Sequence, residues 1–341
     1  MTVESQLLLS WYKINGRVLP WRVTGRAHPD AYAVWVSEIM LQQTTVKTVC
    51  DYFDRWMKRF PTLQSLAESS LDDVLLLWQG LGYYTRAKKM YECAQVVTSQ
   101  YNGTFPADRE KLLKLPGIGP YTASSICAFA FNQPETVVDG NVIRVLARYY
   151  GITEEVDRSV ITPLAEKLTP QDNGADYASA IMDLGATVCT PSTPDCSKCP
   201  WQEKCLAHHK GIESSIPLLK KTEKKKKNGA VFILTDEKNN IFIRKRPGRG
   251  LLSGLWELPW TEDGSFPFET DWEKLPQTVR HIFTHVDLTL QFYRSSRPCP
   301  ADFLETGVFV SKEQLSEYAF STLMKKVLKE IKLQSVQETP L

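Results

Sequence analysis

Four cysteines lie within a short stretch near the middle of this 341-residue chain, and they constrain its fold more than any other feature. They are Cys189, Cys196, Cys199 and Cys205, in the spacing C-x6-C-x2-C-x5-C. Thiolates this close in sequence can converge on one metal centre, which an ordinary hydrophobic core does not require. Zinc sites more often use two C-x2-C pairs separated by a dozen or more residues, and only one such pair is present here. The spacing therefore favours an iron–sulfur cluster, with zinc or a pair of disulfides as the alternatives.

Length and composition indicate a folded protein of two domains. The chain is longer than one ordinary core allows, and 43% of its residues are hydrophobic and 23% charged. The other cysteines are scattered without a disulfide framework, so we expect a reducing compartment. We expect no secretory signal, because the N-terminus lacks the pattern, and no membrane span, because no apolar stretch approaches about 18 residues. With a net charge of only +2, any nucleic-acid surface must be local.

Hydrophobic periodicity divides the chain into two parts of different structural class. Residues 1–210 have apolar residues at three- and four-residue spacing, which predicts an all-α domain that ends with the cysteine loop at 189–205. Residues 211–228 contain a lysine-rich run and few apolar residues, which predicts a linker rather than a phosphate-binding segment. Residues 229–333 predict a small α+β domain, and a polar tail follows over 334–341.

The α+β part contains strand signals and one helix signal. The run 231–234 is typical of a buried strand, and the run 241–246 follows it after a turn at 238–240, which predicts a β-hairpin. A further strand is predicted at 288–293. A helix is predicted over 322–332.

The most specific short motif is a glycine-containing hairpin between two predicted helices. Gly117 and Gly119 flank a single apolar residue directly before the second helix. Glycine permits positive φ and lets backbone N–H groups approach an anion, while the helix N-terminus adds a positive dipole. The motif predicts a phosphate clamp that is indifferent to base sequence. A plain corner between two helices is the alternative.

Two carboxylates occupy settings that make them candidate catalytic groups. Glu38 lies between the apolar runs Val34–Val36 and Ile39–Leu41, which predicts a raised pKa and a proton held near neutral pH. Asp139 follows an apolar run at the start of a predicted helix, about twenty residues after the hairpin. The alternatives are a surface glutamate on an amphipathic helix and an ordinary helix N-cap.

The hairpin, the aspartate and the cysteine spacing together resemble the endonuclease III superfamily of DNA glycosylases over residues 10–206. Tyr121 stands where bifunctional members carry a lysine that attacks the sugar, and a phenol cannot form a Schiff base. Three stretches resemble the adenine glycosylase branch, the MutY family: Leu19–Arg22, Ser37–Thr44 and Leu81–Tyr84. Gly254–Pro259 and Phe283–His285 resemble the Nudix-like domain with which that family reads 8-oxoguanine.

The resemblance implies a monofunctional glycosylase of base excision repair. Such an enzyme flips adenine opposite 8-oxoguanine or guanine out of double-stranded DNA and hydrolyses its N-glycosidic bond, which is the two-carboxylate logic of glycoside hydrolysis. Glu38 is then the general acid toward adenine N7, and Asp139 stabilises the cationic sugar or bonds to it transiently. Asn141 and Tyr121 are implied to order and polarise this site. The four cysteines are implied to hold a [4Fe-4S] cluster that shapes a DNA-binding loop.

The resemblance also places residues around the base and along the DNA. Those around the adenine are Arg17, Leu19, Trp21, Arg22 and Asp183. Trp21 and Leu19 are implied to stack on the base, and Asp183 to accept a hydrogen bond from its amino group. Those along the DNA are Gln43, Thr44, Leu81, Tyr83, Gly117, Gly119, Phe283, Thr284 and His285. Core packing is the alternative for Trp21, and a strand-end turn is the alternative for Phe283–His285.

The chain departs from the family pattern in three places. Thr284 stands where the family usually has serine, and Asp183 stands where some members have glutamate. The loop Val23–His28 is slightly longer than expected, which affects the placement of Arg22. No R-E-x2-E-E helix follows Trp256-Glu257, so we expect no catalytic Mg²⁺ site and no Nudix hydrolase activity.

Two rival functions stay open at this point. The first is a superfamily glycosylase for thymine or uracil opposite guanine, which Tyr121 also fits but the second domain and Gln42–Thr44 disfavour. The second is a non-catalytic lesion sensor, which the presence of both carboxylates disfavours. We expect a monomer that acts on double-stranded DNA without a membrane partner. It would be located in the bacterial cytoplasm at the nucleoid or, in a eukaryote, in the nucleus or mitochondria.

Overall fold

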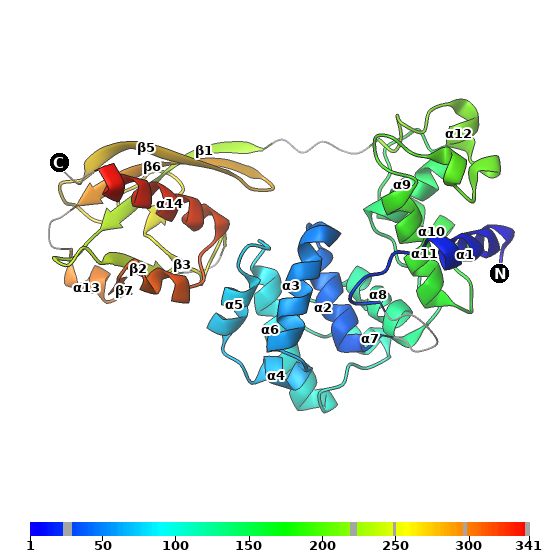
Figure 1. The fold of residues 1–341 in the computed structure, drawn as a ribbon, viewed down its shortest axis with the longest axis horizontal. Coiled ribbons are helices and arrows are strands. Elements are labelled where there is room, and N and C mark those ends of the chain that lie inside the picture. The colour runs from blue at the N-terminus through cyan, green and yellow to red at the C-terminus, as the bar shows by residue number, and fades with distance from the viewer. Residues whose placement is uncertain (23–28, 219–223, 248–249, 296–298, 338–341) are drawn as a thin grey trace. The chain divides into compact units, whose positions relative to one another are not determined.

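The structure is a computed structural model, shown in Figure 1, and it describes residues 1–22, 29–218, 224–247, 250–295 and 299–337. The chain divides into two compact units. The first comprises residues 1–68 and 89–221, and the second comprises residues 69–88 and 222–341. The expected fold class is confirmed, because helices build the first unit and the second unit contains two β-sheets. Among the described residues, no helix is long and apolar enough to cross a bilayer.

The first unit consists of helices, several of which begin at a side-chain cap. Its helices are α1 (Val3–Asn15), α2 (Ala31–Leu41), α3 (Val46–Arg59), α4 (Leu63–Ala67), α6 (Thr85–Tyr101), α7 (Arg109–Leu112), α8 (Pro120–Phe131), α9 (Gly140–Tyr149), α10 (Arg158–Leu168), α11 (Gly174–Thr187) and α12 (Leu206–Lys210), with short 3₁₀ helices at Cys196–Lys198 and Gln202–Lys204. Side-chain oxygens of Thr45, Asp108 and Asp157 accept backbone N–H groups at the starts of α3, α7 and α10. Such caps satisfy donors that a helix start leaves unpaired.

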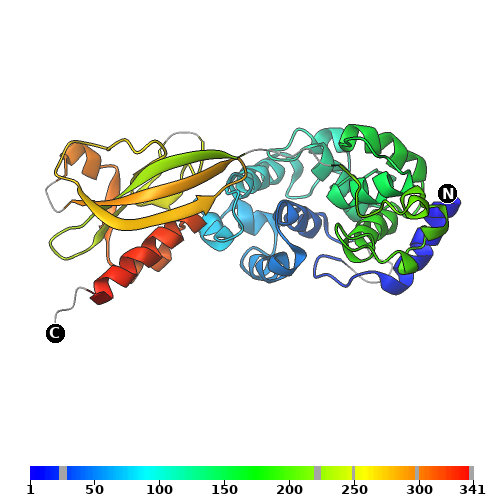
Figure 2. The same ribbon diagram turned by 90° about the horizontal axis from the view of Figure 1, so that it is seen from above.

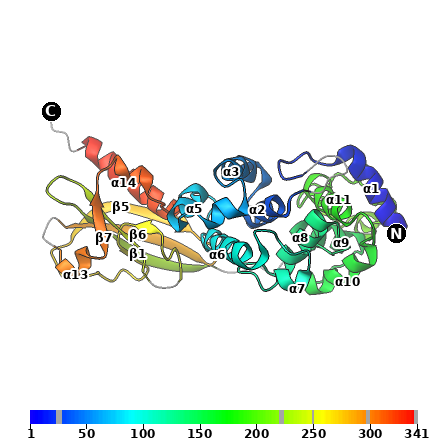
Figure 3. The same ribbon diagram turned by 90° about the horizontal axis from the view of Figure 1, so that it is seen from below.

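Helix α2 is the central element of this unit, packed against α8 and α3 (Figure 3). Tyr32 and residues 34–40 are buried, so it has no solvent-exposed polar face along most of its length. A helix that is apolar on every side belongs inside a core. Its one acidic residue, Glu38, is therefore carried into the interior.

Two close approaches fix the helices that surround α2. Gly117 has φ of +76°, and a Cβ atom there would lie 2.6 Å from Cβ of Lys89, so the hairpin between α7 and α8 requires glycine at this position. At Gly185 in α11, a Cβ atom would lie 2.6 Å from Cβ of Asn141 in α9. Helices α9 and α11 therefore pack backbone to backbone beside α8 (Figure 3).

The second unit contains a four-stranded and a three-stranded sheet. The strands are β1 (Lys225–Leu234), β2 (Ile241–Lys245), β3 (Trp256–Glu257), β4 (Trp260–Thr261), β5 (Glu273–Ile282), β6 (Val286–Ser295) and β7 (Gly307–Val310). Their orders are β4-β1-β6-β5 and β3-β2-β7. Strands β1 and β6 run parallel from Lys225 beside Val286 to Leu234 beside Ser295, and β5 pairs antiparallel with β6 (Figure 2).

Helices complete this unit. They are α5 (Leu71–Trp78), α13 (Ala301–Leu304), α14 (Thr322–Gln337) and a 3₁₀ helix at Gln314–Glu317. Helix α14 packs against β5 (Figure 3). One core joins both sheets and α14 through residues such as Val231, Ile243 and Leu323. Residues 69–88 belong with this unit because Tyr84 donates a hydrogen bond to the Phe320 carbonyl and Asp72 pairs with Lys245.

The predicted hairpin of 231–234 with 241–246 is wrong. Apart from one bridge between Thr235 and Ile241, the two strands pair in different sheets. The reason is that Val231 and Ile233 of β1 and Ile241 of β2 face the same core, so burial separates the strands into two layers instead of one ladder.

Two further boundaries differ from the sequence expectation. Strand β1 starts at Lys225, inside the expected linker 211–228, because its lysines can extend into solvent from a paired backbone. Helix α14 continues to Gln337, into the expected tail 334–341. Within these segments, 219–223 and 338–341 lie outside the described residues, as does the loop Val23–His28.

Candidate active site

A cavity of about 870 Å³ in the first unit brings together most of the predicted site residues. Those that line it are Arg17, Leu19, Trp21, Arg22, Glu38, Gln43, Thr44, Tyr121, Asp139 and Asn141. They come from α2, from the start of α8, from the start of α9 and from the segment after α1. Residues separated by more than one hundred positions in sequence thus share one site. Of the described residues that line it, none is a lysine.

Glu38 is the buried acid of this cavity, with 5% of its surface exposed. Burial raises the pKa of Glu38 to about 7, and the nearby charge of Asp139 acts in the same direction. Hydrogen bonds from Tyr121 and Ser125 and the charge of Arg22 oppose the rise in pKa without cancelling it. The predicted raised pKa is therefore confirmed. A carboxyl group that titrates near neutral pH can hold a proton and deliver it to a leaving group.

Asp139 is the second carboxylate, and it serves as the N-cap of α9. Its Oδ1 accepts the backbone N–H of Val142 at 2.8 Å, and its Oδ2 accepts Nδ2 of Asn141 at 2.8 Å. Asp139 is thus a helix N-cap, as the alternative reading expected. The same carboxylate also lines the cavity that contains Glu38. These two bonds fix the orientation of the carboxylate. A carboxylate that stabilises a developing cation must be held in such a fixed orientation.

Tyr121 connects the hairpin to the acid. It lies in the first turn of α8, two residues after Gly119, and its hydroxyl is hydrogen-bonded to Glu38 and Ser125. Burial, together with the charges of Glu38 and Asp139, raises the pKa of Tyr121 well above its ordinary value, so the phenol stays protonated. It can therefore act as a fixed hydrogen-bond donor toward the carboxyl group.

Asp183 is placed differently from the sequence expectation. It is fully buried on α11, is absent from the described lining of the cavity, and binds two arginines. Arg17 contacts it through Nη2 at 2.6 Å, and Arg22 through Nη1 at 2.8 Å. Burial acts to raise the pKa of Asp183, but the hydrogen bonds and charges of Arg22 and Arg17 outweigh it and lower the pKa. Asp183 holds the arginines that line the cavity.

The predicted stacking residues lie at the wall. Trp21 and Leu19 are buried, and the ring of Trp21 meets that of Phe53 edge-on with centroids 5.5 Å apart. Core packing of Trp21 is therefore observed together with cavity lining. Gln43 lines the cavity with a φ of +60°, a left-handed conformation that is costly for a residue with a side chain. With this backbone conformation the chain leaves the helical path of α2 at Gln43.

A chain of hydrogen bonds runs from the carboxylate toward the cysteine loop. Oδ1 of Asn141 accepts Nη2 of Arg144 at 2.8 Å, and Nε of Arg144 donates to the Cys189 carbonyl at 2.7 Å. Arg148, one turn further along α9 and buried, donates to Sγ of Cys189 at 3.4 Å. The start of α9 therefore orients Asp139 while its later turns hold the first cysteine of the loop.

The four cysteines line one cavity at the end of the first unit and are all free thiols. Burial raises the pKa of Cys199 to about 12, and the other three cysteines add to that rise because thiolates repel one another. Four such groups become thiolates together only around a cationic centre. The donor set fits a thiolate-bound metal group, and the disulfide alternative is not observed.

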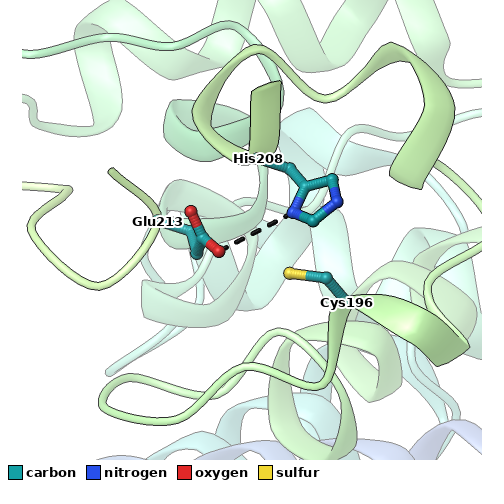
Figure 4. Close-up of side chains that lie close together, drawn as sticks. All are labelled: Cys196, His208 and Glu213. Carbon is teal, nitrogen blue, oxygen red and sulfur yellow. Dashed lines mark ion pairs between the residues drawn. The ribbon is translucent and has the colours of Figure 1, made fainter. Parts of the chain in front are cut away.

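A second group of possible ligands borders the same cavity. Ligand atoms of Cys196, His208 and Glu213 lie within 4.8 Å of one another, and Nδ1 of His208 lies 3.7 Å from Oε1 of Glu213 (Figure 4). Within the described residues, Nδ1 of His208 and Oε2 of Glu213 are buried without a hydrogen-bond partner. These two side chains lie close to Cys196 and belong to the surroundings of the cysteine loop.

The second unit places Phe283–His285 in the turn between β5 and β6. The strand-end position is confirmed. The hydroxyl of Thr284 lies 2.5 Å from the hydroxyl of Tyr83, and the Phe283 ring meets that of His281 edge-on with centroids 4.5 Å apart. Tyr83 is exposed and has a φ of +48°. Leu81, by contrast, is buried. From Trp256 to Phe283 the described chain contains no helix, in agreement with the missing acidic Nudix motif.

Sequence reasoning missed three residues of this site. Ser125 bonds Glu38 from the second turn of α8, and Arg158 lies at the cavity with its guanidinium 5.4 Å from the centroid of the Tyr121 ring. Arg144 joins Asn141 to the cysteine loop. Helical spacing from Tyr121 to Ser125 and from Asn141 to Arg144 was a usable signal, because residues three or four apart share a face. Nothing in the sequence marks Arg158.

Comparisons with known proteins agree with this geometry. Residues 36–171 match the HhH-GPD superfamily of base excision DNA repair proteins, and residues 230–330 match the NUDIX domain. An adenine DNA glycosylase of Buchnera aphidicola from Schizaphis graminum is 38% identical, over 84% of this chain and 85% of its own length. One from Rattus norvegicus is 36% identical, over 96% of this chain and 78% of its own length. The chain belongs to the adenine DNA glycosylases.

Solved structures are consistent with this family assignment. A thermostable thymine-DNA glycosylase is 28% identical, with a TM-score of 0.55, and covers 60% of this chain and 95% of its own. An endonuclease III in complex with DNA is 22% identical, with a TM-score of 0.52 over 62% of this chain and 99% of its own, which shows the shared fold. The glycosylase described here is thus a DNA repair hydrolase with a helix–hairpin–helix unit and a Nudix-like unit.

Proposed function

We propose that this glycosylase excises adenine opposite 8-oxoguanine, or opposite guanine, by monofunctional hydrolysis of the N-glycosidic bond. The observation that carries the proposal is the pairing of Glu38, with its pKa of about 7, and Asp139 within one cavity. The cavity is large enough for an extruded base, since pockets for small ligands measure about 300–1,000 Å³. The described lining contains no lysine to form a Schiff base, which supports hydrolysis by water.

The residues divide the chemistry between them. Protonated Glu38 is the general acid toward adenine N7, so that the base departs as a neutral molecule. Tyr121 holds this carboxyl group. Asp139 faces C1′ and stabilises the oxocarbenium or bonds to it transiently, while Asn141 keeps it in place. Arg17 and Arg22, held by Asp183, contact the base together with Trp21 and Leu19.

DNA contacts belong to the remaining predicted residues. Gln43 and Tyr83 are proposed to fill the vacated stack, with Thr44 and Leu81 on the lesion side. Gly117 and Gly119 are proposed to present backbone N–H groups to a phosphate. In the second unit, Thr284 with Phe283 and His285 is proposed to read 8-oxoguanine, where the hydroxyl pair of Thr284 and Tyr83 offers a donor and an acceptor.

We propose that Cys189, Cys196, Cys199 and Cys205 hold a [4Fe-4S] cluster. Its support is the set of four free thiols around one cavity, a donor set typical of such clusters. When bound, the cluster supplies a structural staple, because hydrolysis needs no electron transfer. We also propose a monomer that acts on double-stranded DNA, in the cytoplasm at a bacterial nucleoid or in the DNA-containing compartments of a eukaryotic cell.

The test uses two duplexes and alkali. One duplex carries adenine opposite 8-oxoguanine, and the other carries thymine opposite guanine. We expect the purified protein to give strand cleavage at adenine only after alkali treatment, since a monofunctional enzyme leaves an intact abasic strand. Release of thymine without release of adenine would instead assign the protein to the thymine branch. Release of neither base, with retained binding of the lesion duplex, would favour a lesion sensor.

A further inference from the structure

The cavity that contains Glu38 and Asp139 has an uneven distribution of positive charge. Of the described residues that line it, three are cationic, and these are Arg17, Arg22 and Arg158. Asp183 lies within 2.8 Å of both Arg17 and Arg22, so both guanidiniums are already ion-paired inside the protein. For Arg158, no ion pair is found within the part of the chain that the structure describes. Its charge is therefore available to a ligand.

The surroundings of Arg158 explain why its charge stays available. It is the first residue of α10, and the carboxylate that precedes it, Asp157, is already engaged as the helix cap. Oδ1 of Asp157 accepts the backbone N–H of Ser159 at 2.8 Å and its hydroxyl at 2.5 Å. Arg158 is exposed, and its guanidinium lies 5.4 Å from the centroid of the Tyr121 ring. A guanidinium placed over an aromatic ring keeps its N–H edge directed outward.

The exposed position of Arg158 suits the DNA backbone, which does not enter the cavity with the base. When a nucleotide is extruded, its base enters the pocket, but the phosphates on either side stay at the rim with the strand. Glu38 and Asp139 in the interior disfavour a phosphate there. An arginine at the rim matches a phosphate through two parallel N–H donors, and the N-terminus of α10 adds a positive dipole.

We propose that Arg158 binds a backbone phosphate next to the extruded nucleotide and so holds the strand at the mouth of the active site. The contact is a positioning contact, not a chemical one, because a flanking phosphate takes no part in hydrolysis of the N-glycosidic bond. The proposal rests on the proposed function, in which a nucleotide is extruded into this cavity.

The first experiment measures the salt dependence of binding. Wild type, Arg158→Gln and Arg55→Gln are titrated onto a duplex whose target adenosine carries a 2′-fluoro group that resists cleavage. Arg55 is the matched control, since it is exposed, its guanidinium lies 4.3 Å from the ring centroid of Tyr52, and it is absent from the described cavity lining. Loss of one phosphate contact should reduce the slope of log K against log[salt] by about 0.9. We expect this for Arg158→Gln, with about tenfold weaker binding, and no change for Arg55→Gln.

The second experiment locates the phosphate. Methylphosphonate linkages, which carry no charge, replace one at a time the phosphates that flank the target adenosine. One of them should weaken wild-type binding and leave Arg158→Gln binding unchanged, because the contact is already missing. If every linkage weakens both proteins equally, Arg158 does not bind a flanking phosphate and the proposal is wrong.

A merely structural role for Arg158 predicts a different pattern. If the side chain only supports Tyr121, Arg158→Gln would slow single-turnover base release at saturating protein and leave the salt slope unchanged, which overturns the proposal. Arg158→Lys should keep the wild-type slope, because the charge is retained. Failure of the proposed function is seen separately, since the wild-type protein would then release no adenine. Both binding experiments would in that case be repeated on whichever duplex the wild type processes.

Discussion

The substitution Glu38→Gln tests whether burial of the Glu38 carboxyl group lowers the free energy of unfolding of the enzyme. Burial raises the pKa of Glu38 from 4.5 to about 7. A shift of this size corresponds to about 3 kcal/mol of free energy. Because the pKa of the folded protein exceeds that of the unfolded chain, the stabilising contribution is complete below about pH 4.5. It is lost as the pH rises to about 7, where the folded protein must bury a carboxylate.

Glutamine has nearly the same shape and does not ionise, so it removes this loss. Between pH 5 and pH 8, the stability of Glu38→Gln relative to the wild type should rise by about 2.5 kcal/mol. For a unit of about 200 residues, this corresponds to a relative gain of roughly 5–10 °C in Tm. The control is Glu92→Gln on α6, whose side chain is about half exposed, and for which we expect no such pH-dependent gain.

The same variant should lose activity. In single-turnover release of adenine, an amide cannot donate a proton as an acid, and the loss should be about 10²–10⁴-fold. The wild-type rate should fall about tenfold per unit of pH above about 7, while the residual rate of the variant should not follow this titration. A variant that is no more stable than the wild type at pH 8, or that retains the wild-type rate, would refute the role of Glu38 as a buried general acid.

Three further predictions concern other parts of the first unit. Asp139→Asn should bind the lesion duplex but release no adenine, in a gel-shift assay with parallel alkali cleavage, and turnover near the wild-type rate would contradict its assignment. Asp183→Asn should lower Tm by about 10 °C, because breaking a buried ion pair costs about 3–5 kcal/mol, whereas an unchanged Tm would show that Arg17 and Arg22 find other partners. Cys199→Ser should reduce bound iron and visible absorbance in the purified protein, and an unchanged iron content would exclude this cysteine as a ligand.

Local patterns in the sequence predicted those parts of the site that depend on neighbours along the chain. The apolar residues on both sides of Glu38 predicted its burial and raised pKa, and α2 confirms both. The hairpin glycines predicted a tight turn before a helix, and Gly117 has the positive φ that this turn requires. In each case the determining interactions lie within a few residues of the motif.

Features that depend on distant partners were not predictable in the same way. The ion pair of Asp183 with Arg22 joins residues 161 positions apart, and no local pattern shows that a carboxylate will bind arginines rather than a base. The division of β1 and β2 between two sheets follows from the packing of a common core, while their sequences alone have the alternation and turn of a hairpin. Arg158 joins the site only because α10 begins beside α8.

The parallel pairing of β1 with β6 places the first residue of β1 beside the turn Phe283–His285. Lys225, the first residue of β1, donates its backbone N–H to the carbonyl of His285 at 2.9 Å. Strand β1 lies between β4 and β6, so slipping it by one residue would turn its buried side chains outward. Insertions or deletions before Lys225 must therefore be absorbed by the connecting segment itself. A change in the length of that segment would leave the turn that carries Thr284 in place, because the pairing of β1 with β6 holds it.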